Sequence, residues 1–237
     1  KALERAGRIA KRVIERDMRE LVRIERKSLP DGIDKPSLAA LLASIHGRSA
    51  VGRTLDEYVN SWLVRTPQER AAARIKQLAT TGASPTSIWG QVRLDVARAT
   101  KAAGDVARTM MTDTSTAVRT AAAGKKNKLV WISVLDDRTT IQCINLDGDT
   151  WFEGDDHVYP PVHVNCRSSV GIHMGGEAPK RSYIDWLKRQ PKSVQDTVLG
   201  VERAEAWRSA SISVGQMVDA TKTRVLNLSS LRKLGRL

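Results

Sequence analysis

The sequence predicts an α+β protein that is mainly helical, with a small β-containing Cys/His module in its C-terminal half. Apolar residues recur at three- and four-residue steps through much of residues 2–123, which is typical of amphipathic helices. A β-branched and aromatic run begins at Leu129 and is typical of a strand. Both cysteines, Cys143 and Cys166, follow this run. We therefore expect three regions, which are a basic helical region (1–126), a Cys/His module (127–175) and a helical tail (176–237).

Helices dominate the first region. Ser37 is a suitable N-cap for a short apolar helix. Thr66 and Glu69 can form a capping box with Pro67 in the first turn of the next long helix. Gly104 is a weak point in a segment rich in Ala and Thr. The predicted helices cover residues 2–28, 38–45, 54–62, 66–80 and 85–123.

The second region changes to strand-like sequence. Residues 129–135 are predicted to form a strand, and residues 168–172 the last strand of the module. Asp147-Gly148 is a turn signal, which we interpret as joining two short strands. Gly175 and Gly176 are expected to close the module. Helices then return at residues 182–187, 192–199 and 201–209, whereas residues 212–237 give no firm pattern.

The charge is large and uneven. The formal net charge is +13, with 24 Lys and Arg against 13 Asp and Glu in residues 1–126. Residues 127–175 reverse the balance, with three basic and seven acidic residues, and residues 176–237 restore it with 12 against six. Basic flanks of this kind indicate an acidic partner, of which nucleic acid is the simplest. The alternative is that these cations only solvate long helices.

The first predicted helix is the strongest candidate for a nucleic-acid contact. Residues 1–27 hold ten Lys and Arg against five Asp and Glu. No recognition-helix or zinc-finger pattern is present, so we expect non-specific contact with the phosphates of double-stranded DNA. The predicted contact residues are Arg5, Arg8, Lys11, Arg12, Arg16, Arg19, Arg23, Arg26 and Lys27.

Cys143, His163 and Cys166 form a C…H-x-x-C constellation. Thiolates and imidazole are good zinc ligands, but a structural zinc site takes four donors. His157 and Asp136 are the candidates for the fourth position. The alternatives are a thiol pair and buried polar packing. We expect the three residues to cluster in space, and we expect no other cofactor.

The acidic residues of the module fit structural roles better than catalytic ones. Asp136 and Asp147 are expected to accept hydrogen bonds from turn amides, and Arg138 and Arg167 to form internal ion pairs or cap carbonyl groups. The order Asp156-His157-Val158-Tyr159-Pro160 is similar to the first element of an HNH nuclease, but the second metal-binding histidine has no suitable place. Because the chain also lacks a phosphate-binding glycine loop and a nucleophile motif, we expect a protein that is not an enzyme.

The ordered motifs of the module resemble the head-morphogenesis family of tailed bacteriophages, which includes the Mu protein F-like minor head proteins. The resemblance covers about residues 108–172 and continues in residues 183–200. Thr140 stands where many members have the first cysteine of a C-x-x-C pair. The motifs that carry the resemblance are Asp136-Asp137-Arg138-Thr139, Cys143, Leu146-Asp147-Gly148, Pro161, His163, Cys166-Arg167, and Tyr183 to Pro191 with Val198-Leu199-Gly200.

The resemblance implies a minor capsid protein inside the virion, near the portal vertex. Family members associate with the portal protein, enter the head during assembly and are implicated in DNA packaging or delivery. The implied partners are the portal, DNA and further copies of the chain, with no membrane anchor, and assembly would take place in the host cytoplasm. One alternative is an internal virion protein that is ejected with the genome during DNA ejection. A metal-dependent nuclease-like module is the other.

Overall fold

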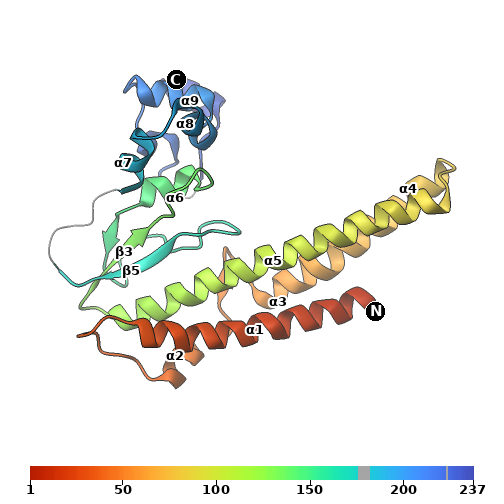
Figure 1. Ribbon diagram of the computed structural model, residues 1–237, viewed down its shortest axis with the longest axis horizontal. Coiled ribbons are helices and arrows are strands. Elements are labelled where there is room, and N and C mark those ends of the chain that lie inside the picture. The colour runs from red at the N-terminus through yellow and green to blue at the C-terminus, as the bar shows by residue number, and fades with distance from the viewer. Residues whose placement is uncertain (176–181, 223) are drawn as a thin grey trace. The chain divides into compact units, whose positions relative to one another are not determined.

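A computed structural model describes residues 1–175, 182–222 and 224–237 of the chain (Figure 1). The described residues are mostly helical and include two small antiparallel sheets, which confirms the predicted α+β class. They divide into two compact units. The first comprises Lys1–Ser28, Pro36–Ala117 and His163–Asn165, and the second comprises Leu29–Lys35, Val118–Val162 and Cys166–Leu237.

Helix α1 (Ala2–Ser28) is the predicted first helix, and it packs one face into the first unit. Its buried residues, Gly7, Ile14, Met18 and Val22, recur at helical spacing. A Cβ atom on Gly7 would lie 2.7 Å from a methyl group of Val64. Glycine at this position therefore lets α1 lie against the neighbouring helical segment.

Ser37 caps helix α2 (Leu38–Ser44) as predicted, because its hydroxyl accepts a hydrogen bond from the amide of Ala40 at 3.1 Å. A two-residue hairpin follows, formed by β1 (Ser49–Ala50) and β2 (Arg53–Thr54).

The next helical segment is continuous from α3 (Leu55–Tyr58) through the π-helical turns of η1 (Val59–Arg65) into α4 (Thr66–Thr80). The predicted capping box at Thr66 is wrong. Helix α4 has the predicted bounds, but Thr66 has helical dihedral angles and its amide bonds back to Ser61, so the chain is already helical where α4 begins and no cap forms. A capping box is formed instead by Thr54 and Glu57, at the start of α3.

Helix α5 (Pro85–Ala123) runs unbroken past Gly104, and Gly124, at a φ of +52°, ends it. Its buried Asp113 receives two hydrogen bonds from Arg48, at 2.9 and 3.0 Å. This bidentate pair raises the pKa of Arg48 through the hydrogen bonds from its guanidinium to the carboxylate. Both residues belong to the first unit.

The second unit contains a three-stranded antiparallel sheet in the order β4-β3-β5. Its strands are β3 (Lys128–Ile132), β4 (Thr150–Trp151) and β5 (Ser169–His173). The predicted strand over residues 129–135 is therefore present but ends at Ile132. One face of the sheet buries a core that includes Leu129, Trp131, Trp151 and Val170.

Helix α6 (Ile141–Leu146) replaces the short strand that the sequence predicted before the Asp147-Gly148 turn. Five of its six residues are buried, so no polar face marks the segment as helical. Short apolar runs of this kind do not distinguish a strand from a helix. The turn itself is confirmed, with Gly148 at a φ of +80° and β4 after it.

The predicted tail helices are confirmed as α7 (Ser182–Lys188), α8 (Lys192–Leu199) and α9 (Val201–Arg208). A 3-10 turn, η2 (Val214–Met217), and helix α10 (Leu228–Lys233) follow where the sequence gave no firm pattern. They form a second core around Tyr183, Leu187 and Met217. Gly176, which was expected to help close the module, lies outside the described residues. No helix in the described ranges is both long and apolar enough to cross a membrane.

The buried carboxylate of Asp147 joins the sheet to the tail helices of the second unit. One oxygen accepts the amide of Ser133, just after β3, at 2.8 Å. The other accepts the amide of Tyr183 in α7, at 2.9 Å, and the hydroxyl of Ser182 at 3.3 Å. The hydroxyl of Ser133 in turn bonds the carbonyl of Cys143 and accepts the indole N–H of Trp131. Because the amide of Ser133 bonds to the side chain of Asp147 and not to a neighbouring strand, β3 ends at Ile132.

We expect Asp147→Ala to lower the free energy of unfolding of the second unit by about 2–3 kcal/mol. The substitution leaves two buried backbone amides without their acceptor. Urea unfolding monitored by circular dichroism measures the loss. Asp137→Asn is the control, because Asp137 is exposed in the same loop region and should change stability by less than about 0.5 kcal/mol. An equal effect of the two substitutions would contradict the role of Asp147.

Candidate functional site

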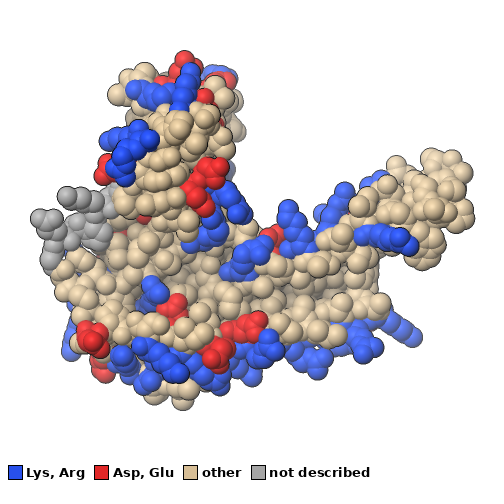
Figure 2. All heavy atoms as spheres, in the orientation of Figure 1, with Lys and Arg blue, Asp and Glu red and all other residues tan. Residues whose placement is uncertain are grey.

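The exposed side of α1 carries a continuous stripe of cations. At about 100° per residue, Arg5, Arg8, Arg12, Arg16, Arg19, Arg23 and Lys27 fall within roughly one third of the helix circumference. All seven are exposed. Figure 2 shows Lys and Arg side chains gathered along this helix. We call these seven residues the α1 stripe.

Most of the stripe is not neutralised by carboxylates of its own chain. Arg16 pairs with Asp17, and Arg23 pairs with Glu20. The other five make no ion pair with any residue that the structure describes. Neighbouring guanidinium groups therefore face solvent together, and this arrangement favours a polyanionic partner.

Two predicted contact residues lie outside the stripe. Lys11 is half-buried and pairs with Asp56 and Glu15, and the hydrogen bond to Asp56 raises its pKa. Arg26 donates a hydrogen bond to the carbonyl of Pro36 at 2.8 Å. Both cations therefore bind neighbouring segments of the first unit. The sequence alone did not separate these two residues from the exposed cations of α1.

The structure brings Cys143, His163 and Cys166 together, as predicted. Their ligand atoms all lie within 4.8 Å of one another. The two sulfur atoms are 3.7 Å apart, and both cysteines are buried and free. Hydrogen bonding between the thiols, together with burial, raises the pKa of Cys143. Without a metal this residue therefore remains a thiol at neutral pH.

The donor set fits zinc in chemistry and spacing. Two thiolates on one tetrahedral zinc, each about 2.3 Å from the ion, would be about 3.8 Å apart. Nδ1 of His163 lies 3.0 Å from the carbonyl of Val164, which can only accept, so the proton belongs on Nδ1. The lone pair is then on Nε2, the arrangement that metal-bound histidines use. Ordinary contact between two thiols gives a similar sulfur separation, so the distance fits both alternatives.

The predicted fourth ligands have other neighbours. Asp136 is bound by Arg167, and His157 stacks on Trp151 with ring centroids 4.0 Å apart. Nε2 of His157 lies 3.6 Å from a carboxylate oxygen of Asp149. Neither residue belongs to the metal-type cluster found among the described residues. Three protein donors are thus in place, and a fourth would have to come from elsewhere.

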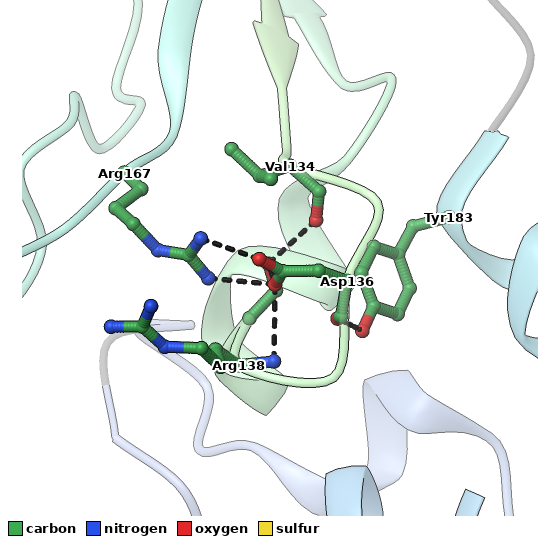
Figure 3. Close-up of polar contacts among 6 residues, drawn as sticks. Val134, Asp136, Arg138, Arg167 and Tyr183 are labelled. Atoms are coloured by element: carbon green, nitrogen blue, oxygen red, sulfur yellow. Dashed lines mark hydrogen bonds and ion pairs between the residues drawn. The ribbon is translucent and has the colours of Figure 1, made fainter. Parts of the chain in front are cut away.

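Asp136 forms a second polar centre, beside the first turn after β3 (Figure 3). Arg167 donates to both of its carboxylate oxygens, at 2.5 and 2.7 Å. The amide of Arg138 and the hydroxyl of Thr139 also donate to it. The predicted turn role of Asp136 and the ion pair of Arg167 are both confirmed.

This set of donors stabilises the charged form of Asp136. The hydrogen bonds from Arg167 are the main cause, and they hold its pKa at about 2, compared with 3.8 for an ordinary aspartate. Tyr183 adds a hydrogen bond to the backbone carbonyl of the same residue, and burial raises the pKa of this tyrosine. The sequence placed Tyr183 in a family-like motif but did not predict its contact with Asp136, and it gave no signal for Ser133.

We expect Cys166→Ser to destabilise the second unit by about 1–3 kcal/mol, because it places a hydroxyl in an apolar core. Thermal unfolding measures the change, and DNA binding should be unaffected. Repeating the thermal unfolding in the presence of the chelator EDTA distinguishes a zinc site from a thiol pair. A chelator that lowers the melting temperature of the unmodified chain, but not that of His163→Ala, indicates bound zinc. If the chelator has no effect and metal analysis finds none, the cysteines form a thiol pair.

We expect Asp136→Asn to lower stability at pH 7 by about 1–2 kcal/mol, since the pair with Arg167 is partly exposed. The folded pKa is depressed, so the contribution of Asp136 is full above about pH 4 and is lost as the pH falls toward 2. Urea unfolding at several pH values should therefore show a weaker acid dependence in Asp136→Asn. Asp137→Asn should keep the acid dependence of the unmodified chain, and identical acid profiles for all three proteins would contradict the assignment.

Comparison with known proteins gives no relative on which to base a function. No family model matches the chain, and no curated protein or solved structure matches it significantly. The function therefore has to be inferred from the side chains and surfaces described above.

Proposed function

We propose that this chain is a minor head protein of a tailed bacteriophage, which sits near the portal and contacts packaged DNA through α1. The α1 stripe is the observation that carries this proposal. The ordered motifs of residues 136–167, with their resemblance to head-morphogenesis proteins, supply the phage context. In this role the chain acts by binding and needs no catalytic step.

The dimensions of the stripe suit a DNA duplex. Arg5 and Lys27 are 22 residues apart, or about 33 Å along an α-helix. One turn of B-form DNA has about the same length. Duplex DNA carries one phosphate per roughly 1.7 Å of axis, so several arginines of one helix can reach phosphates at the same time.

Contact through this stripe would carry little sequence preference. Arginines that line one side of a helix packed on its own unit can reach the phosphates. Reading bases instead requires a helix inserted into the major groove. A protein that lines or guides packaged DNA has to accept any sequence. Non-specific, salt-sensitive binding is therefore what the proposed role needs.

The module that contains the motifs offers a different kind of surface. Residues 127–175 hold seven acidic and three basic residues. Of these acids, Asp137, Glu153, Asp155 and Asp156 are exposed. An acidic surface repels DNA, so the module is suited to a protein partner. The portal is the partner that the family resemblance implies, with further copies of the chain around it.

We expect the purified chain to bind duplex DNA of unrelated sequences with similar affinity, and the affinity to fall steeply with salt. The triple variant Arg5→Gln, Arg8→Gln, Arg12→Gln removes three cations of the stripe that form no ion pair with described residues. If each contacts a phosphate, the slope of log affinity against log salt should decrease by about 2.7. Fluorescence anisotropy at several salt concentrations measures this slope.

The matched control neutralises three cations that are not part of α1, through Lys188→Gln, Arg189→Gln and Lys192→Gln. These side chains are exposed on and after α7. The control should bind DNA like the unmodified chain. Equal losses in both triple variants would mean that net charge, and not the α1 stripe, determines binding.

We expect the chain to co-purify with its cognate portal and to be present in procapsids before DNA enters. Particles assembled without it should package or deliver DNA poorly. Pull-down with the portal and counts of filled particles test these two points. If particles that lack the chain package and deliver DNA normally, the head role is wrong. Loss of the chain from the particle on DNA release would instead favour an ejected virion protein.

A further inference from the structure

The helical hairpin formed by α4 and the first part of α5 leaves its apolar residues largely uncovered. We call residues 66–101 the arm. Within this fully described stretch only Pro67 and Asp95 are buried. Trp89 is 64% exposed and Val96 is 47% exposed. A surface tryptophan with this exposure is unusual in an isolated protein, since tryptophan is enriched where proteins meet.

The exposed arm residues form one strip with a positive charge inside it. Trp89, Arg93 and Val96 are four and three residues apart, so they share one face of α5. Arg93 makes no ion pair among the described residues, and the arm as a whole has six basic and two acidic residues. The partner of this strip should therefore combine apolar area with negative charge.

The second unit carries a surface of that composition. The three-stranded sheet buries one face, on which Leu129 and Trp131 lie. Alternate residues of β3 lie on the other face, where Val130 is buried and Ile132 is 46% exposed. Phe152, just after β4, is 38% exposed, and the ammonium of Lys128 lies 5.4 Å from its ring centroid. Gly171 of β5 adds no side chain there, and the side chains of Val130 and Ile132 occupy the space beside it. We call this surface the acidic sheet face.

Negative charge borders this face directly. Glu153 follows Phe152 in the chain, and Asp155 and Asp156 come next in the same exposed loop. Asp155 holds the loop in shape by accepting the amide of Phe152 at 2.8 Å. Glu153 and Asp156 form no ion pair with the residues that the structure describes. An apolar centre with a charged rim is the general anatomy of a protein interface.

We propose that the arm of one copy docks on the acidic sheet face of a second copy, with Trp89 and Val96 against Ile132 and Phe152, and Arg93 beside Glu153. The apolar parts match in kind and the charges are opposite, which supports a second copy as the occupant. Because two different surfaces meet, the contact is heterologous and each bound copy leaves one free surface of each kind. Repetition then produces a closed ring or an open chain of subunits.

This docking rests on the proposed function, in which copies of the chain associate, and it identifies the two surfaces that would meet. It involves neither the α1 stripe nor the portal. Purified chain without DNA or portal therefore tests it separately. Sedimentation of the unmodified chain should show oligomers that grow with concentration. The arm variant Trp89→Ser, Arg93→Glu and the face variant Phe152→Ser, Glu153→Lys should each weaken association at least about tenfold.

Mixing the two variants tests the heterologous geometry. The arm variant keeps an intact sheet face, and the face variant keeps an intact arm. Together they should form a one-to-one dimer and nothing larger, although neither associates alone. A chain that carries only the charge reversal Arg93→Glu with Glu153→Lys should associate better than a chain with either reversal alone, because each interface regains an opposite pair. If association recovers in the chain with both charge reversals, the singly reversed chains are also shown to fold.

The control variant Val201→Ser, Lys192→Glu changes one equally exposed apolar residue and one cation outside both surfaces. It should associate like the unmodified chain. The proposal is wrong if the unmodified chain remains monomeric up to about 100 μM, a concentration well above the dissociation constants of typical interfaces. It is also wrong if a mixture of the variants forms no dimer. Arm variants that lose portal binding while self-association is unchanged would assign the arm to the portal instead.

Discussion

The second unit depends on one buried carboxylate, that of Asp147. A buried charge is costly unless hydrogen bonds compensate it, and here the backbone amides of Ser133 and Tyr183 do so. Ser133 follows the central strand, and Tyr183 lies in the first helix of the tail. A single side chain therefore fixes where β3 ends and where α7 packs. Helix α6 is attached to the same network, because the hydroxyl of Ser133 donates to the carbonyl of Cys143.

The motif residues of the module consequently have structural roles that explain their order. Asp136 and Arg167 close one side of the turn after β3, and Tyr183 anchors the backbone carbonyl of Asp136. Cys143 and Cys166 meet in the core on the buried side of the sheet. These contacts join segments that are distant in sequence, so the module can keep its shape while its exposed loops vary. The exposed acids of the loop after β4 are then available for binding.

The two units differ in the side chains that they expose. The first exposes cations along α1 and a basic arm with an uncovered tryptophan. The second exposes Ile132 and Phe152 on one side of its sheet, with acids in the loop that follows Phe152. A protein with both kinds of surface can hold a polyanion through one set of residues and bind copies of itself or another protein through another set. This combination suits a component of a larger assembly.

Much of the fold was predictable because local signals determine it. Periodicity gave α1 and α5, Ser37 gave a helix start, and the tail helices followed from their breaks at Pro191 and Gly200. The cluster of Cys143, His163 and Cys166 was also predictable, since turns between them fold the chain back. Failures occurred where local signals were ambiguous. Thr66 has every feature of a cap, but the helix continues through it, and α6 is too short and too buried to show a helical period.

By itself, the sequence determined the helical class, the uneven charge and the residues that would form the Cys/His cluster, because these depend on local spacing and residue type. Only the tertiary structure decided which charged side chains bind other segments of the same chain. Lys11 and Arg26 looked like the other cations of α1, yet packing gives them partners, whereas Arg5, Arg8 and Arg12 remain exposed. The same holds for the acids. Asp147 is buried and Glu153 is exposed, and this difference depends on contacts between distant segments that no local pattern encodes.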